Sequence, residues 1–181
     1  SSKTSIGLAY ALAADASAPT SIGLTSAGNR DWVESLGIYG QTISYDALTE
    51  IDASKPSVIV DMSGNAGLLS RIAQHLGDNL AFCLNVGLTH WDEAGQDTGV
   101  PQDKREFFFA PSHIQMRMKE WGSAEFEKRS SRFVLQVTQQ SAEWMLLENL
   151  SGVEALADVY RDVCDGTLAP EKGLVIKIAG S

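Results

Sequence analysis

The sequence predicts an α/β fold built on a parallel sheet, and three observations lead to this prediction. Apolar runs rich in β-branched residues, clearest at residues 57–62 (SVIVDM), indicate buried strands. Segments of about ten residues with the character of helices lie between these runs. Short turns containing Gly, Pro or Asn separate the two kinds of segment. Strands that alternate with helices in this way require a parallel sheet with right-handed crossovers.

Residues 1–14 (SSKTSIGLAYALAA) predict a first helix that begins after a run of hydroxyl side chains. Its free backbone N–H groups, hydroxyls and positive dipole end are suited to an anion. A simple Ser/Thr cap at a frayed terminus explains the same residues. In open α/β sheets such a helix follows a buried strand, and we expect that first strand to be absent from this chain.

The next elements follow the same reasoning along the chain. Strands are predicted at residues 20–25, 42–45, 57–62 and 80–86, and helices at residues 29–36 and 66–76. Asn29 and Asn65 are the expected N-caps, and Gly37 and Gly77 the expected helix ends.

The second part of the chain is predicted to be largely helical. A polar, turn-rich loop covers residues 88–105 and precedes an aromatic strand at residues 106–109. Helices are predicted from Pro111 to Trp121, over 123–149 and over 151–166, before a closing strand at 174–178. Residues 1–110 are therefore expected to form one coherent α/β unit, and residues 111–181 a helical segment with one strand that needs a sheet from elsewhere.

Composition excludes several classes of function. The net charge of −9 argues against a nucleic-acid surface. Cys83 and Cys164 lie in apolar settings far apart in sequence, which favours two thiols in a reducing compartment. The three histidines show no spacing typical of metal ligands, and we find no membrane-spanning run or signal peptide. We therefore expect a cytoplasmic protein with no nucleic-acid or membrane partner.

Small and polar residues follow the predicted strands, where open α/β sheets bind their ligands. Turns are small and polar in any protein, so each cluster alone is weak evidence. The four clusters together predict cofactor contacts from Ser1, Ser2, Lys3, Thr4, Thr25, Ser26, Asn29, Arg30, Tyr45, Met62, Ser63, Gly64, Asn85, Val86 and Gly87.

The end of the second strand indicates which dinucleotide is bound. Enzymes selective for the unphosphorylated cofactor carry Asp or Glu at this position to hold the ribose hydroxyls. Here Thr25 and Ser26 supply hydroxyls, and Arg30 supplies a guanidinium that suits a 2′-phosphate. The sequence therefore predicts NADPH, although Arg30 could equally be a solvated helix residue.

Two further chemistries are weaker alternatives. Asp61 ends an apolar strand as in a Walker B motif, and Lys3 with Thr4 partly matches a P-loop, but Ser2 replaces the expected Gly. His90, at the start of the polar loop, is a candidate catalytic acid, although a lone loop histidine is more often a surface residue.

The chain resembles the second half of a medium-chain dehydrogenase/reductase, specifically an uncharacterised quinone-oxidoreductase-like branch. The residues that carry the resemblance include SSKTSIGLAYALA, GLTSAGNRDWVESLGIYGQTISYDAL, VIVDMSGNAGLLSRIAQHLGD, NVGLTHWD, FFFAPSHIQMRMKEWG and DGTLAPEKGLVIKI. The resemblance implies that residues 1–110 are a Rossmann-like dinucleotide-binding domain, and that residues 111–181 are a helical segment and closing strand that return to a GroES-like catalytic domain. It also implies a zinc-free site, a homodimer paired through the strand at 106–109, and a complementing N-terminal segment of the same protein.

The resemblance also distributes the predicted contacts around the cofactor. Ser1–Thr4 would replace the usual glycine-rich turn at the pyrophosphate, and Thr25, Ser26, Arg30 and Tyr45 would surround the 2′-phosphate. Met62–Gly64 would line the ribose, and Asn85–Gly87 the nicotinamide.

We therefore expect an NADPH-dependent oxidoreductase acting on a carbonyl, quinone or enoyl substrate. The main alternative is a non-catalytic nucleotide-binding or structural subunit, and a P-loop-like hydrolase comes third.

Overall fold

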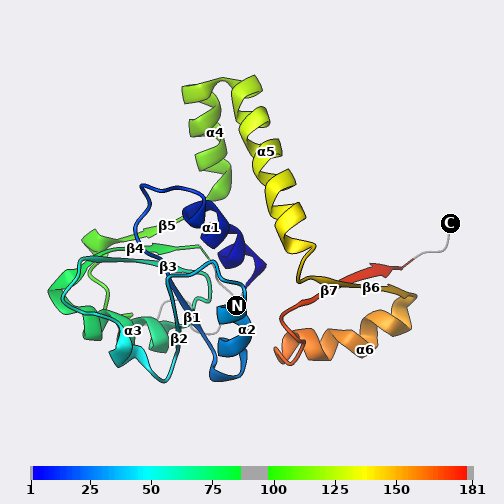
Figure 1. The fold of residues 1–181 in the computed structure, drawn as a ribbon, viewed down its shortest axis with the longest axis horizontal. Helices are drawn as coiled ribbons and strands as arrows, with labels where there is room; N and C mark the ends of the chain where they lie inside the picture. The colour runs from blue at the N-terminus through cyan, green and yellow to red at the C-terminus, as the bar shows by residue number, and fades with distance from the viewer. Residues whose placement is uncertain (1, 87–97, 179–181) are drawn as a thin grey trace. The chain divides into compact units, whose positions relative to one another are not determined.

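The computed structural model describes residues 2–86 and 98–178, which form a mixed α/β fold with parallel strand pairs. The chain divides into two compact units, residues 1–130 and residues 131–181, which we describe separately. Figure 1 shows the elements of both units along the chain.

Among the residues that the structure describes, unit 1 contains five strands in two parallel groups. The first group pairs β1 (Ile22–Thr25) with β2 (Gln41–Ser44), and the second has the order β3-β4-β5. The members of the second group are β3 (Ser57–Asp61), β4 (Leu80–Asn85) and β5 (Arg105–Phe107). The helices of unit 1 are α1 (Lys3–Ala13), α2 (Arg30–Ser35), α3 (Ala66–Leu76), α4 (Ala110–Trp121) and the start of α5 (Ser123–Ser141).

The sequence signals for α3 are confirmed in the structure. Asn65 is the N-cap, and its side-chain oxygen accepts a hydrogen bond from the Leu68 backbone N–H at 2.7 Å. Gly77 ends the helix with φ +53°, a conformation that residues with a Cβ rarely adopt. The cap residue and the glycine therefore fix α3 at both ends.

One face of both strand groups packs on α3. Leu24 of β1, Ile43 of β2 and Ile59 of β3 join a core that includes buried apolar residues of α3. Because side chains alternate along a strand, Gly23 and Val58 point to the opposite face. The Tyr39 ring lies against Gly23, whereas Val58 is 62% exposed. The two groups thus share the core under α3 but differ in how their other face is covered.

An aromatic contact marks the turn between α4 and α5. Gly122 turns the chain with φ +79° directly after Trp121. The guanidinium carbons of Arg117 and Arg129 lie 5.3 Å and 4.4 Å from the Trp121 ring centre. Glu125 accepts a hydrogen bond from Arg129 at 2.8 Å, so this arginine interacts with both the ring and a carboxylate.

Unit 2 is a strand–helix–strand motif. Its strands β6 (Leu146–Ser151) and β7 (Lys172–Lys177) pair in parallel, and α6 (Val153–Cys164) connects them. The sequence-based prediction of one helix over 123–149 is wrong after Ser141, where α5 ends. Residues such as Trp144 and Leu147 fit a helical period, but pairing with β7 places residues 146–151 in a strand.

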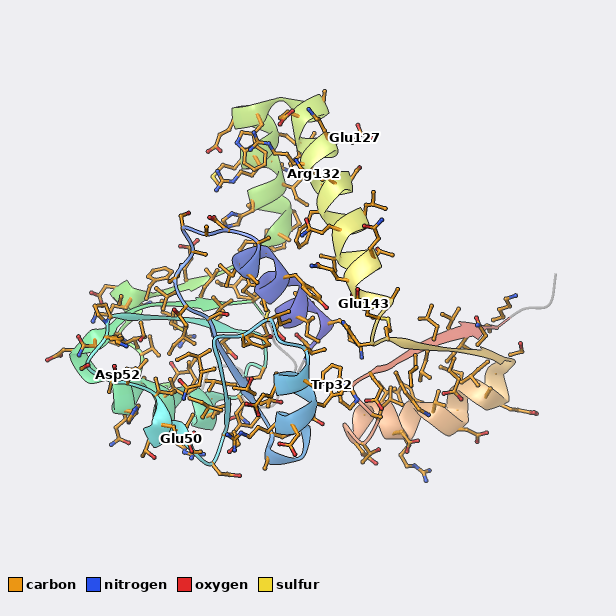
Figure 2. The ribbon with its side chains drawn as sticks, in the orientation of Figure 1. Trp32, Glu50, Asp52, Glu127, Arg132 and Glu143 are labelled. Atoms are coloured by element: carbon orange, nitrogen blue, oxygen red, sulfur yellow. The ribbon has the colours of Figure 1, made fainter. Side chains whose placement is uncertain are left out.

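Exposed charges mark the periphery of unit 1. Figure 2 labels Glu50 and Asp52 on the connection between β2 and β3, and Trp32 on α2. Asp52 forms an ion pair of 3.1 Å with Lys55.

Within residues 2–86 and 98–178, no helix is long and apolar enough to cross a membrane.

Candidate functional site

The carboxyl end of β3 is organised by the buried carboxylate of Asp61. Its Oδ1 atom accepts hydrogen bonds from the Ser63 N–H and hydroxyl, both at 2.9 Å, and from the Gly64 N–H at 3.1 Å. Ser63 Oγ in turn accepts from the Asn65 N–H at 3.1 Å. These bonds hold residues 61–65 in one defined turn between β3 and α3.

Asn85 connects this turn to the end of β4. Its side-chain amide donates to Asp61 Oδ2 at 3.1 Å, and the Val86 N–H donates to the Asp61 carbonyl at 2.8 Å. The Asn85 Oδ1 atom is buried and has no hydrogen-bond partner. A buried acceptor without a donor is costly, so this atom is a point where a ligand hydroxyl or N–H could bind.

Tyr45 brings the end of β2 into the same region. Its backbone N–H donates to the Thr25 carbonyl at 2.9 Å, and its own carbonyl accepts from Arg71 of α3 at 3.0 Å. Burial, and then the nearby Asp61 carboxylate, raise the pKa of Tyr45 above its ordinary value of 10.0. The phenol therefore stays protonated at neutral pH and can act as a hydrogen-bond donor.

Thr25 ends β1 and is fully buried, and its hydroxyl has no hydrogen-bond partner. The next residues are more accessible: Ser26 and Arg30 are exposed and Asn29 is half-buried. The Asn29 N–H donates to the Ser26 carbonyl at 3.0 Å, which closes a 3₁₀ turn before α2. Ser26 and Arg30 can thus reach an anion from outside, whereas Thr25 in this conformation cannot.

The first helix uses its hydroxyls for its own cap. Ser2 Oγ accepts from the Ser5 N–H at 3.1 Å, and the Ser5 hydroxyl donates to the Ser2 carbonyl at 2.7 Å. Lys3 and Thr4 are exposed in the first turn. This geometry matches the alternative given above, in which these residues form a simple Ser N-cap. The positive end of the α1 dipole stays accessible.

The remaining predicted site residues divide into two groups. Met62, Ser63, Gly64 and Val86 are half-buried around the Asp61 turn. Ser1, Gly87 and His90 lie outside the described residues.

Two residues that sequence reasoning left out of the cofactor contacts organise this region. Asp61 appeared in the sequence only as a possible Walker B residue, yet four protein groups already donate to its two oxygens. A carboxylate has about four lone-pair positions, so Asp61 is a structural hub rather than a metal ligand. Arg71 carries no sequence signal, because its link to Tyr45 depends on how α3 lies against β2.

The described residues contain no group of three or more His, Cys, Asp or Glu that could hold a metal ion.

The site is thus a set of polar groups at the carboxyl ends of β1, β2, β3 and β4. It offers a protonated phenol, a buried amide acceptor and exposed hydroxyl and guanidinium donors. These groups suit the binding and orientation of a polar, anionic ligand.

Comparison with known proteins gave one family. No curated protein and no solved structure matches this chain. A family model described as "Protein of unknown function (DUF2855)" matches residues 1–169, which is most of the chain. The protein therefore belongs to the DUF2855 family.

Proposed function

We propose that unit 1 binds NADPH and that the protein is a zinc-free oxidoreductase acting on a carbonyl, quinone or enoyl substrate. The observation that carries the proposal is the network that joins Asp61, Ser63 and Asn85 at the ends of two parallel strands. It presents the unpartnered Asn85 Oδ1 where open α/β sheets bind dinucleotides.

The arrangement of helices supports a Rossmann-like, doubly wound sheet. α3 covers the face that carries Leu24 and Ile59. α2 packs against β1 and β2, and its buried Val33 lies outside the core cluster under α3. Helices on both faces of a parallel sheet are the arrangement in which nucleotides bind at the strand ends. In this proposal, unit 2 belongs to a GroES-like catalytic domain.

The residues at the strand ends fit the parts of NADPH. Asn85 Oδ1 would accept a hydrogen bond from a ribose hydroxyl, which would satisfy its buried lone pairs. The exposed Arg30 and Ser26 would bind the 2′-phosphate, for which a guanidinium is well suited. The N-terminus of α1 would receive the pyrophosphate at the positive end of its helix dipole.

NADPH, when bound, supplies the hydride that reduces the substrate. The protein's own part is to fix the position of the reacting groups and to hold donors where negative charge develops. The Asp61 turn serves the first purpose, because the four groups that donate to the Asp61 carboxylate tie Ser63, Gly64 and Asn85 to it.

Cofactor binding is tested by thermal-shift and calorimetric titration of the chain with NADPH and with NADH. We expect NADPH to raise the melting temperature and to bind at least about tenfold more tightly than NADH. Arg30→Ala should remove this preference, because only NADPH carries the 2′-phosphate. Lys55→Ala is the matched control, since it removes an exposed cation that pairs with Asp52 away from the strand ends. A melting temperature that neither cofactor changes would refute the proposal.

Turnover separates the oxidoreductase from the non-catalytic alternative. NADPH oxidation is followed at 340 nm with a quinone, a conjugated enone and an aldehyde. Oxidation with one of these substrates supports the enzyme. Binding of NADPH without oxidation across the panel would instead favour a non-catalytic nucleotide-binding subunit.

A further inference from the structure

The carboxylate of Asp61 is compensated by hydrogen bonds instead of by a cation. Its Oδ1 atom accepts from both Ser63 donors and the Gly64 N–H, and its Oδ2 atom accepts from the Asn85 amide at 3.1 Å. Among the described residues, none of the ion pairs includes Asp61. Its side chain is buried, so solvent screens the charge weakly. The carboxyl end of β3 therefore keeps a negative charge.

Asp61 also determines which end of the Asn85 amide is left for a ligand. The two residues are register partners at the ends of β3 and β4, so strand pairing brings their side chains together. A carboxylate only accepts hydrogen bonds, whereas an amide has a donor nitrogen at one end and an acceptor oxygen at the other. The reversed amide would place two oxygens against each other with no hydrogen between them. The nitrogen is therefore held at Asp61, and Asn85 Oδ1 is the end without a partner.

The surroundings of Asn85 Oδ1 favour an uncharged donor over an anion. This oxygen is a buried acceptor, and it belongs to the same amide that contacts the Asp61 carboxylate. The charge of Asp61 contributes, after burial, to the raised pKa of Tyr45, so its field extends beyond its own turn. The Arg105 guanidinium, on the neighbouring strand β5, donates to the Thr98 hydroxyl at 3.0 Å. A ligand hydroxyl would satisfy Oδ1, whereas a phosphate oxygen would meet an acceptor and a negative charge.

We propose that Asp61 is a positioning residue that sets the polarity of the cofactor site. By holding the nitrogen of Asn85 it presents Oδ1 as an acceptor, so the ends of β3 and β4 select an uncharged, hydroxyl-bearing part of the ligand and exclude its phosphates. The phosphates are left to the exposed Ser26 and Arg30 and to the N-terminus of α1. This inference rests on the proposed function, because it takes NADPH as the ligand.

Exchange of the two side chains separates polarity from structure. Asp61→Asn keeps an oxygen for Ser63 and Gly64 but presents an N–H group to Asn85. The Asn85 amide then has to turn its oxygen toward position 61 and its nitrogen toward the ligand. The double variant Asp61→Asn/Asn85→Asp restores the acceptor, because the amide at position 61 donates to one oxygen of the carboxylate at position 85 and leaves the other oxygen open. The double variant also has the same net charge as the unmodified chain.

Calorimetric titration with NADPH measures the consequence for binding. We expect Asp61→Asn to weaken binding at least about tenfold, and the double variant to bind within about threefold of the unmodified chain. Asp52→Asn is the matched control, because Asp52 accepts from the Ser54 N–H and hydroxyl in the same local pattern, but on the connection between β2 and β3. Its affinity for NADPH should be unchanged. Equal weakening in the single and double variants would overturn the proposal, since it would show that only the native carboxylate in the turn matters.

A second measurement uses the free chain and needs no cofactor. NMR of the ¹⁵N-labelled chain follows hydrogen exchange of the Asn85 side-chain amide. We expect this exchange to be at least about tenfold slower than that of the exposed Asn149 amide, and to become faster in Asp61→Asn. Equal exchange at Asn85 and Asn149 in the unmodified chain would overturn the proposal, because Asp61 would then not hold the amide.

The two measurements separate this inference from the proposed function. If NADPH does not bind the unmodified chain, the proposed function fails, while the amide exchange still decides whether Asp61 fixes the orientation of Asn85. If NADPH binds equally well to the unmodified chain and to Asp61→Asn, the cofactor site stands and the role of Asp61 in ligand selection fails. If Asp61→Asn does not fold, the double variant has to match the affinity of the unmodified chain, and a clear loss of affinity in it would overturn the proposal.

Discussion

The side-chain amide of Asn85 donates to the carboxylate of Asp61 at 3.1 Å and so joins the ends of β3 and β4. Asp61 is only 8% exposed, and the Ser63 and Gly64 groups that donate to it are part-buried. Asp61→Ala would leave these donors without an acceptor. Because buried donors without partners are costly, we expect the free energy of unfolding to fall by about 2–4 kcal/mol.

Urea denaturation measures this loss, with Ser57→Ala as the control at the opposite end of β3. The Ser57 hydroxyl makes an exposed bond to the Lys55 carbonyl, so its removal should cost less than about 0.5 kcal/mol. Equal losses in the two variants would show that the Asp61 network is not what stabilises this strand end.

Local sequence signals were sufficient where an element is defined by its own residues. The β-branched run predicted a strand at residues 57–62, and β3 ends one residue earlier, at Asp61. Asn65 and Gly77 correctly predicted the two ends of α3. These signals act within a few residues of the chain, through capping and through the intrinsic preference for extended backbone.

Sequence signals were insufficient where an element depends on a distant partner. Residues 146–151 form β6 because they pair with β7, and this pairing overrides the helical spacing of Trp144 and Leu147. The strand-end clusters were visible in the sequence. The bond between Asp61 and Asn85 was not, because it depends on β3 and β4 lying side by side.

A second prediction concerns the close approach of β1 to Tyr39. A Cβ at Gly23 would lie 2.9 Å from Tyr39 Cγ, closer than real Cβ contacts, and the Tyr39 hydroxyl is held by the Ser5 carbonyl. Overpacking of this kind typically costs about 1–3 kcal/mol, so we expect Gly23→Ala to lower the free energy of unfolding by that amount. Chemical denaturation with circular dichroism detection measures it.

Gly28→Ala is the matched control, because a Cβ there meets no atom within 4 Å. Its stability should be unchanged or up to about 1 kcal/mol higher, since alanine reduces the entropy of the unfolded chain. The double variant Gly23→Ala/Tyr39→Leu should recover part of the lost stability. A Gly23→Ala protein as stable as the unmodified chain would mean that Tyr39 moves aside without cost.

The two cysteines should differ in reactivity. Burial, and then the Asp61 carboxylate, raise the pKa of the Cys83 thiol from 9.0 to about 11, partly opposed by Arg105, whereas Cys164 is exposed. The thiolate is the reactive form, so at pH 8 an aromatic disulfide reagent should modify one thiol per chain quickly and the second only on unfolding. Cys164→Ser should abolish the fast phase, and a fast phase that survives would contradict the burial of Cys83.

The same thiol makes stability depend on pH at the alkaline end. The folded chain holds the Cys83 proton more tightly than the unfolded chain does, so the unfolded chain loses it first as the pH rises. The stability that the raised pKa of Cys83 gives the folded chain is therefore fully present below about pH 9 and is lost as the pH rises to about 11. The raised pKa of Tyr39 and Tyr45 acts in the same direction, so the Cys83 part is isolated by comparison with Cys83→Ala. The melting temperature of that variant should fall less steeply over the same range.

The last prediction compares two asparagines at helix N-caps. Asn65 accepts a 2.7 Å bond from the Leu68 N–H, whereas the Asn29 side chain makes no capping bond to α2. Loss of a bonded N-cap typically lowers stability by about 1 kcal/mol. Leu69, Ile72 and Leu76 of α3 are part of the core, so fraying of the first turn of this helix destabilises the whole unit. We therefore expect Asn65→Ala to lower the free energy of unfolding by about 1 kcal/mol and Asn29→Ala by less than about 0.5 kcal/mol, measured by urea denaturation. Equal losses of stability in the two variants would mean that the capping hydrogen bond of Asn65 is not what makes this asparagine stabilising.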